Sequence, residues 1–145
     1  MSVSTTSRSI EHIYAEVQQF YARHMQLLDA GEAEEWAMTF TEDGVFAPPS
    51  LPEPIRGRAN LAAGARKAAE ERAAAGETHR HWQGMIAVDP RPDESLHVTC
   101  YTQVLVTPRN GSTRLHLMCV CRDVLVRENG RLLVRERRVT RDDRP

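Results

Sequence analysis

The stretch Thr78–Gly84 (THRHWQG) places two histidines two residues apart. On a β-strand the side chains alternate between the two faces, so His79 and His81 would share one face with Gln83. Histidine changes charge near neutral pH, and it can move protons or bind a metal. Three interpretations of this stretch are therefore open: an acid/base pair, a metal site, or two solvated surface residues.

A predicted helix before this strand carries two further candidates. Apolar residues recur at helical spacing from about Ser9 to Ala30, and His24 lies within that inward stripe. His24 is therefore either a buried histidine bonded to the backbone or an active-site group. Asp29 lies just before Gly31, which can cap the end of the helix, and a helix C-terminus is an unfavourable place for a carboxylate. It is either a functional acid/base group or an exposed residue beside a turn.

The rest of the sequence predicts the elements that position these residues. Helices are expected over Ser9–Ala30, Glu32 to about Phe40, and Asn60–Ala75. The proline-rich Ala47–Pro54 is expected to be a loop. Two Asn-Gly pairs between the last three predicted strands are typical of hairpins. Strands are expected over Val45–Ala47, Thr78–Val88, Ser95–Thr107, Thr113–Arg127 and Arg131–Thr140.

Helices followed by a long sheet predict an α+β fold in a single domain, residues 1–145. Strands of this length must curl, so we expect a cone-shaped, mostly antiparallel sheet, an α+β barrel, with the three helices on its concave side. The functional site would be an apolar pocket inside the cone. Met85 and Ala87 are expected to continue the histidine face, which makes that face the more apolar one. His81 would then point inward, and His79 would lie nearer the rim.

Composition and charge argue against several kinds of partner. A formal charge of −1 does not favour nucleic acid or an anionic membrane surface. No apolar run approaches the ~20 residues of a membrane span. The N-terminal MSVSTTSRS lacks the apolar stretch of a signal peptide, so we expect a cytoplasmic protein. Cys100, Cys119 and Cys121 are expected to be reduced and to behave as small apolar residues.

The H-x-H pattern also occurs in the metal sites of cupins. Those sites need a glutamate a few residues further on and a later histidine. Here no carboxylate follows before Asp89, and helices before the sheet do not suit a cupin, although His116 could be the later histidine. We therefore expect no metal and no cofactor.

The block Leu27–Phe46 (LLDAGEAEEWAMTFTEDGVF) resembles the start of the nuclear-transport-factor-two-like superfamily, especially its SnoaL-like and scytalone-dehydratase-like branch. That branch has a long helix ending in an aspartate, a short helix with an inward tryptophan, and an acidic turn into the first strand. HRHWQG stands where the dehydratases carry a strand histidine. The ending RERRVTRDD resembles the same group and the small subunits of ring-hydroxylating dioxygenases.

The resemblance implies that Asp29 and His81 together move a proton. His24 takes the position of an active-site tyrosine in a bile-acid dehydratase of this group. Tyr101 or Tyr14 would hydrogen-bond a developing enolate. Epoxide hydrolysis is not expected, because the strand that carries the Arg-Asp pair in limonene epoxide hydrolases has neither residue here. The other residues expected to contact a substrate are Tyr21, Trp36, Gln103 and His116.

Two functions are consistent with this pattern. The first is a cofactor-free lyase, cyclase or isomerase that acts on a small carbonyl compound of aromatic or polyketide metabolism, with His81 as the base. The second is a non-catalytic binding or assembly protein of the same fold, and such a scaffold has no need for His24, Asp29 and His81 on converging faces. The resemblance also implies a homodimer formed back to back through the outer sheet face, where Leu and Val alternate through Leu115–Val124.

Overall fold

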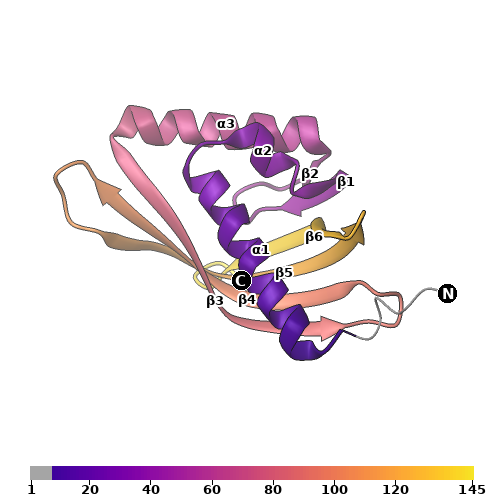
Figure 1. Cartoon of the computed structure of the whole chain (residues 1–145). Helices are drawn as coiled ribbons and strands as arrows, with labels where there is room; N and C mark the ends of the chain where they lie inside the picture. The colour runs from indigo at the N-terminus through magenta and orange to yellow at the C-terminus, as the bar shows by residue number, and fades with distance from the viewer. Residues whose placement is uncertain (1–7) are drawn as a thin grey trace.

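The structure, a computed structural model, describes residues 8–145. Within these residues, three helices and six strands follow one another (Figure 1). The helices are α1 (Ile10–Asp29), α2 (Ala33–Ala37) and α3 (Arg58–Ala75). The strands are β1 (Phe40–Ala47), β2 (Ile55–Arg56), β3 (Glu77–Pro90), β4 (Leu96–Pro108), β5 (Arg114–Glu128) and β6 (Arg131–Arg141).

The six strands form one curved sheet in the order β2-β1-β6-β5-β4-β3. The last three strands, β4 to β6, form an antiparallel meander, as their Asn-Gly hairpin signals indicated. Strand β3 extends it by pairing antiparallel with β4, whereas β1 pairs parallel with β6. Strand pairing does not close the sheet into a barrel, because β2 and β3 are its two edges. Helix α3 lies across the gap between these edges and contacts β1, β2 and β3, while α1 crosses the inner face (Figure 1). The α+β fold with three helices on the concave side is confirmed.

Local signals explain where α1 begins and ends. The Ser9 hydroxyl caps the N-terminus by accepting a hydrogen bond from the backbone N–H of His12 at 3.1 Å. Gly31, with φ of +78°, follows the last turn in the left-handed conformation that glycine adopts readily. These two residues fix the length of the helix, and with it the position of Asp29 at its C-terminal end.

The second predicted helix is too long. It was expected to reach Phe40, but α2 ends at Ala37, and β1 begins at Phe40 rather than at Val45. Phe40 lies opposite Val134 in the parallel pairing of β1 with β6. This contact joins residues about 90 positions apart, so the local sequence pattern carries no sign of it.

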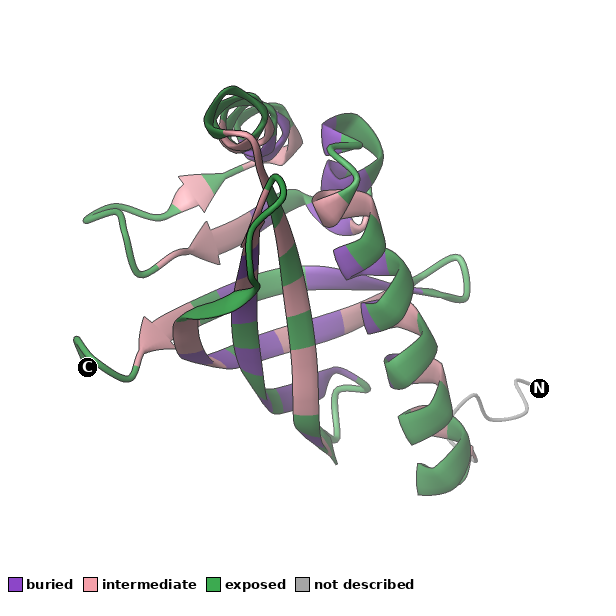
Figure 2. Cartoon of the chain, turned by 90° about the vertical axis from the view of Figure 1, so that its left-hand side faces the viewer, coloured by how far each residue is buried: buried purple, intermediate pink, exposed green. Residues whose placement is uncertain are grey.

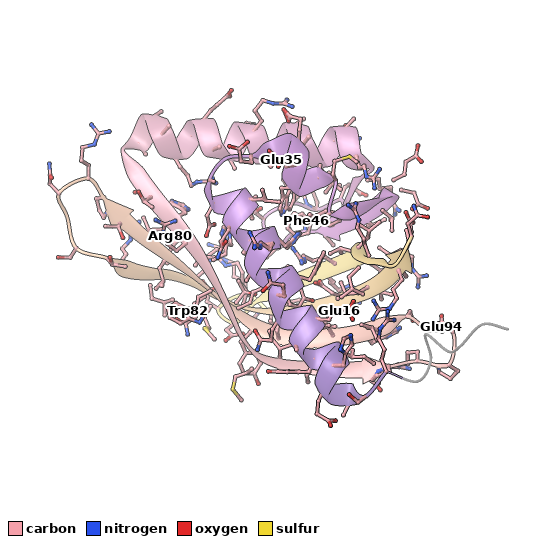
Figure 3. All side chains as sticks on the ribbon, viewed as in Figure 1. Glu16, Glu35, Phe46, Arg80, Trp82 and Glu94 are labelled. Atoms are coloured by element: carbon pink, nitrogen blue, oxygen red, sulfur yellow. The ribbon has the colours of Figure 1, made fainter. Side chains whose placement is uncertain are left out.

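A β-bulge corrects the predicted alternation along β3. His79, His81 and Gln83 face inward as expected, whereas Trp82 is 67% exposed on the other face (Figure 3). The pairing with β4 then shifts between Gly84 and Ala87. Met85 has φ of +51° and is 78% exposed, so it does not continue the histidine face. A bulge inserts an extra residue and therefore reverses the faces beyond it.

The core lies between α1, α2, α3 and the inner face of the sheet, and Figure 2 shows the alternation of buried and exposed residues along the strands. The three cysteines are free and buried, as predicted. None of the helices within residues 8–145 is both long and apolar enough to cross a membrane. The largest fully buried apolar side chains are Phe40, Leu61, Leu125, Val17, Val98, Val106 and Val134.

Candidate active site

A cavity of about 650 Å³ lies inside the cone, within the range typical of sites for small metabolites. Helix α3, the inner face of the sheet and the proline-rich segment 48–51 form its walls. Apolar side chains make up most of the lining, and His81, Thr102 and Arg137 are among its polar side chains, which also include charged groups such as Lys67 and Arg72. The predicted apolar pocket is therefore present, with more polar groups in its lining than the sequence indicated.

His81 and Asp29 are in direct contact at one side of this cavity. The Nδ1 of His81 lies 2.6 Å from Asp29 Oδ1, and the backbone N–H of His81 donates to Asp29 Oδ2 at 3.1 Å. The Asp29 side chain is only 7% exposed, and that of His81 is 20% exposed. Because the carboxylate only accepts hydrogen bonds, it holds the proton of the neutral imidazole on Nδ1. Nε2 then remains a free acceptor with no partner among residues 8–145.

Strand alternation predicted that His81 points inward, and the family resemblance implied that it works together with Asp29. His79, two residues earlier, bonds a different carboxylate: its Nε2 lies 3.1 Å from Glu77 Oε1. His79 also lies beside His116, with ring centroids 6.1 Å apart, and both line the cavity. The two histidines of the H-x-H stretch therefore have separate partners.

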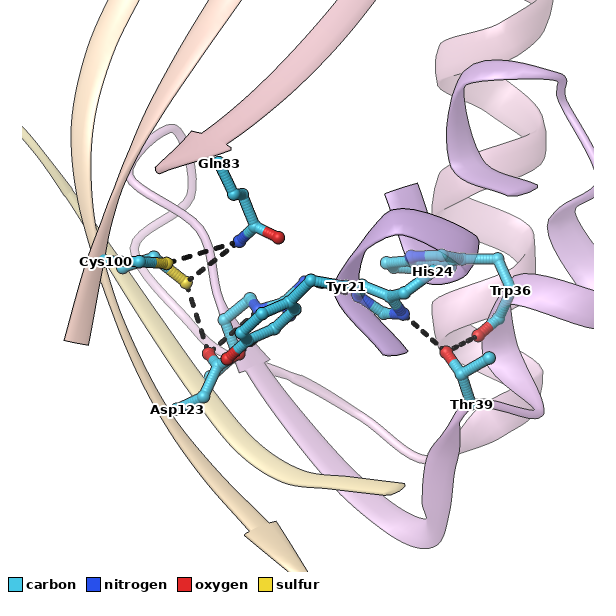
Figure 4. Close-up of polar contacts among 9 residues, drawn as sticks. Tyr21, His24, Trp36, Thr39, Gln83, Cys100 and Asp123 are labelled. Carbon is cyan, nitrogen blue, oxygen red and sulfur yellow. Dashed lines mark hydrogen bonds and ion pairs between the residues drawn. The ribbon is translucent and has the colours of Figure 1, made fainter. Parts of the chain in front are cut away.

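A second polar cluster surrounds a buried ion pair, Asp123 with Arg137, on the inner face of the sheet. Arg137 donates from Nε to Asp123 Oδ1 at 2.9 Å and from Nη2 to Oδ2 at 2.8 Å. Tyr21 donates its hydroxyl to Asp123 Oδ2 at 2.7 Å, and the Cys121 thiol donates to Oδ1 at 3.2 Å (Figure 4). All four oxygen lone-pair positions of the carboxylate are in use, which fixes the guanidinium in one orientation.

His24 belongs to this cluster and does not line the cavity. Its Nε2 lies 2.7 Å from Arg137 Nη1, and its Nδ1 lies 2.6 Å from the Thr39 hydroxyl, which donates to the Trp36 carbonyl (Figure 4). Since Arg137 can only donate, Nε2 accepts and Nδ1 donates. Both nitrogens of His24 are thus occupied within the protein, and the ring does not line the cavity, so this geometry does not favour the catalytic role predicted for it.

Burial and charge explain the titration of this cluster. Burial, with further contributions from Arg137 and His81, holds the pKa of His24 well below its ordinary value, so the ring is neutral. Burial and the Asp123 carboxylate raise the pKa of Tyr21. Burial alone would lower the pKa of Arg137, but the Asp123 carboxylate outweighs it, and the pKa is raised. The guanidinium therefore stays charged in the core.

The other predicted substrate contacts divide into two groups. Trp36 and His116 line the cavity, and Tyr21 instead bonds Asp123 and borders a smaller groove between α1 and β3. Tyr101 and Gln103 lie on the outer face of β4, because its more apolar face, with Val98, Cys100, Val104 and Val106, turns inward. Tyr14 is 38% exposed and accepts a hydrogen bond from Gln18. Tyr14, Tyr101 and Gln103 therefore do not line the cavity.

Sequence reasoning missed Asp123, Arg137 and Thr102. Thr102 could have been found, because it shares the apolar face of β4 with Cys100 and Val104. Asp123 and Arg137 are 14 residues apart on neighbouring strands, and charged residues on strands are usually solvated. Only the cross-strand pairing of these two residues shows that each has a partner in the core.

Comparison with known proteins gives matches to a family model and to solved structures. The model of the SnoaL-like domain matches residues 12–138. A search of curated proteins finds no match. Aln2 from a Streptomyces species is 35% identical, with a TM-score of 0.85 and 94% of each chain covered. ActVI-ORFA from Streptomyces coelicolor is 37% identical, with a TM-score of 0.82, covering 90% of this chain and 98% of that one. A Catenulispora acidiphila protein, solved in complex with S-DNPA, is 40% identical, with a TM-score of 0.79 and coverage of 90% and 94%.

Proposed function

The chain belongs to the SnoaL-like domain family, and from this premise we propose that it is a cofactor-free acid/base enzyme, a lyase, cyclase or isomerase. The family includes polyketide cyclases and dehydratases. We propose a small carbonyl compound of polyketide type as the substrate. His81 is the base, and Asp29 is the residue that orients it.

The contact between His81 and Asp29 is the observation that carries this proposal. A general base must be within reach of the substrate, and it must present an unprotonated atom. The 2.6 Å contact at Nδ1 leaves Nε2 as the basic atom, on a residue that lines the cavity. When Nε2 takes up a proton, the nearby carboxylate stabilises the imidazolium that forms.

The cavity supports a small, largely apolar substrate. Its volume of about 650 Å³ suits a metabolite of a few fused rings, and the aromatic rings of Trp36 and Phe46 offer flat apolar surface. The Catenulispora acidiphila protein, 40% identical, is known in complex with the small molecule S-DNPA. We infer that the corresponding cavity of this chain also takes a small molecule.

The proposed reaction begins with proton removal from a carbon next to a carbonyl. The Nε2 of His81 takes that proton, the C–H electron pair forms the enolate, and the imidazole becomes an imidazolium. In the second half, the imidazolium returns the proton. In dehydration it goes to a β-hydroxyl, which leaves as water when the enolate breaks the C–O bond; in cyclisation it goes to the oxygen of a second carbonyl that the enolate carbon attacks; in isomerisation it goes to another carbon. Dehydration, cyclisation and isomerisation share the first half, so one test serves all three.

The test uses exchange of the α-protons of 2-tetralone in D₂O, followed by NMR above the uncatalysed rate. We expect His81→Ala to reduce exchange by about 10²–10⁴-fold, the usual contribution of a general base. Asp29→Asn should cost a similar factor, and the double variant should lose no more than the larger single loss if the pair acts as a unit. His79→Ala is the matched control and should retain most of the rate. Binding of 2-tetralone without exchange in the wild type would favour the non-catalytic binding protein instead.

A further inference from the structure

We propose that the Arg137 end of the cavity is an oxygen-binding site: it takes the carbonyl or phenol oxygen of the substrate and stabilises the negative charge that develops on it. The catalytic part of this inference rests on the proposed function. The binding part does not, because it depends only on the unpaired hydrogen-bond donors that line the cavity.

Arg137 has more N–H groups than its protein partners occupy. A guanidinium carries five. Asp123 accepts from Nε–H and from one N–H of Nη2, and His24 accepts from one N–H of Nη1. One hydrogen on each terminal nitrogen remains without an acceptor among residues 8–145. Arg137 is 2% exposed and lines the cavity, so bulk water does not readily satisfy these donors.

Trp36 adds another unpaired donor to the cavity lining, near the Phe40 ring that Arg137 also contacts. Its indole Nε1–H is buried and has no hydrogen-bond partner among the described residues, although the side chain lines the cavity and is 2% exposed. The Trp36 ring lies 4.9 Å from the ring of Phe40, and the guanidinium carbon of Arg137 lies 5.7 Å from the same Phe40 ring. Buried polar groups in native proteins are almost always paired, so unpaired donors at a cavity wall indicate a ligand acceptor.

Thr102 adds a hydroxyl to the cavity lining further along the sheet, since it lies opposite Cys119 whereas Arg137 lies opposite Asp123. It lines the cavity, is 6% exposed, and has no oxygen or nitrogen partner among residues 8–145, with only the weakly polar Cys100 thiol interacting with it. Arg137 and Trp36 offer only donors here, and Thr102 can donate as well. The ligand group that matches this set is therefore an acceptor.

The charge balance selects the kind of acceptor. The positive charge of Arg137 is already balanced by Asp123, with 0% exposure of the carboxylate side chain. A carboxylate ligand would leave a net negative charge in the core, which is costly. A neutral carbonyl or phenol oxygen adds no net charge. As an enolate forms, its charge is matched by the proton that His81 takes up, and fixed donors then stabilise it more than they stabilise the ground state.

The binding test compares three probes with the same ring system: 2-tetralone, tetralin without an oxygen, and tetralin-2-carboxylate. Dissociation constants are measured for each, and the carbonyl stretch of bound ¹³C-labelled 2-tetralone is recorded by infrared difference spectroscopy. Hydrogen bonds to a charged group favour binding by on the order of 10- to 100-fold. We therefore expect 2-tetralone to bind more tightly than tetralin by about that factor, with its carbonyl stretch at a lower frequency than in an aprotic solvent. Tighter binding of the carboxylate than of the ketone would overturn the proposed oxygen class.

Variants that each remove hydrogen-bond donors from the cavity wall test which side chains bind the ketone oxygen. Arg137→Lys keeps the charge beside Asp123 but removes the fork of donors, so both the preference for 2-tetralone and the infrared shift should be lost. Thr102→Val is the milder variant and should reduce both, and it decides the question if Arg137→Lys does not fold. Thr99→Val, exposed on the outer face of the same strand, is the matched control and should change neither. Unchanged binding and an unchanged infrared shift in the cavity variants would refute the proposal.

The same probes separate this inference from the proposed function. His81→Ala should abolish α-proton exchange yet retain the preference for 2-tetralone and its infrared shift. Arg137-dependent binding in a wild-type protein that exchanges no protons would contradict the enzyme and support the oxygen site. Exchange that depends on His81 but not on Arg137 would support the enzyme and contradict the oxygen site.

Discussion

The substitution Asp123→Asn should lower the free energy of unfolding by about 3–5 kcal/mol, the usual cost of removing one partner from a buried ion pair. The two side chains are 0% and 2% exposed, so water cannot take over the lost contacts. An asparagine has one acceptor oxygen, whereas Asp123 accepts from two nitrogens of Arg137, from Tyr21 and from Cys121. A domain of this size is typically stable by only 5–15 kcal/mol, so the loss is a large fraction of the total.

Urea unfolding followed by circular dichroism measures this loss at neutral pH. Asp89→Asn is the matched control, because Asp89 pairs with Arg91 at 3.1 Å but both side chains are about half exposed or more. Such surface pairs contribute little, so the control should unfold close to the wild type. The double variant Asp123→Asn/Arg137→Gln should be less destabilised than the sum of its single changes, since it leaves no unpaired charge. A loss below about 1 kcal/mol for Asp123→Asn, at an unchanged denaturant slope, would refute the importance of this pair.

Three further predictions concern pH and assembly. The fold lowers the pKa of His24, so below about pH 6.5 the unfolded chain binds a proton that the folded chain does not, and the free energy of unfolding should fall. Urea unfolding should show that His24→Gln reduces the slope of this free energy against pH by up to ~1.4 kcal/mol per pH unit. The hydrogen bond with Arg127 lowers the pKa of Glu16 (Figure 3), so this pair should stabilise the protein at neutral pH and cease to do so as the pH falls below about 4.5. The variant Glu16→Gln should therefore be less stable than the wild type at pH 7 but equally stable in acid. We propose that the chain forms a homodimer through the outer sheet face, where Trp82 is 67% exposed. Light scattering should then show monomers for Trp82→Arg. A wild type that is monomeric at micromolar concentration would contradict the dimer.

The parts of the fold that the sequence predicted depend on short-range physics. Ser9 and Gly31 bound α1 through capping and backbone conformation. Asn129 and Gly130 have φ of +53° and +77°, which is the hairpin geometry that Asn-Gly favours. Alternation along β3 turned His81 inward, and the end of α1 brought Asp29 to it. The capping, turn and alternation signals each involve residues only a few positions apart, whereas the contact between Asp29 and His81 joins residues 52 positions apart and was implied by the family resemblance.

The parts that could not be predicted depend on long-range pairing. The parallel contact of β1 with β6 moved the start of β1 back to Phe40. The bulge at Met85 is set by the register with β4, so local alternation predicted the wrong face. Tyr101 was expected in the pocket because aromatic hydroxyls suit an active site, but the apolar face of its strand determines which side is buried. Arg137 lines the cavity only because Asp123 lies beside it on the next strand.

Helix α1 determines how the two ends of the site are spaced, and this leads to a prediction about regiochemistry. Asp29 holds His81 and His24 holds Arg137, and these anchors are five residues apart, about 7.5 Å along the helix axis. A ketone whose oxygen lies at Arg137 therefore presents one adjacent carbon to Nε2 of His81 and turns the other away. 2-Tetralone has two such positions, and we expect exchange at one of them only, after correction for the uncatalysed rate at each. Arg137→Lys should make the ketone lie in more than one orientation and remove this selectivity while His81 continues to catalyse slower exchange. Equal catalysed exchange at both positions in the wild type would refute the fixed orientation.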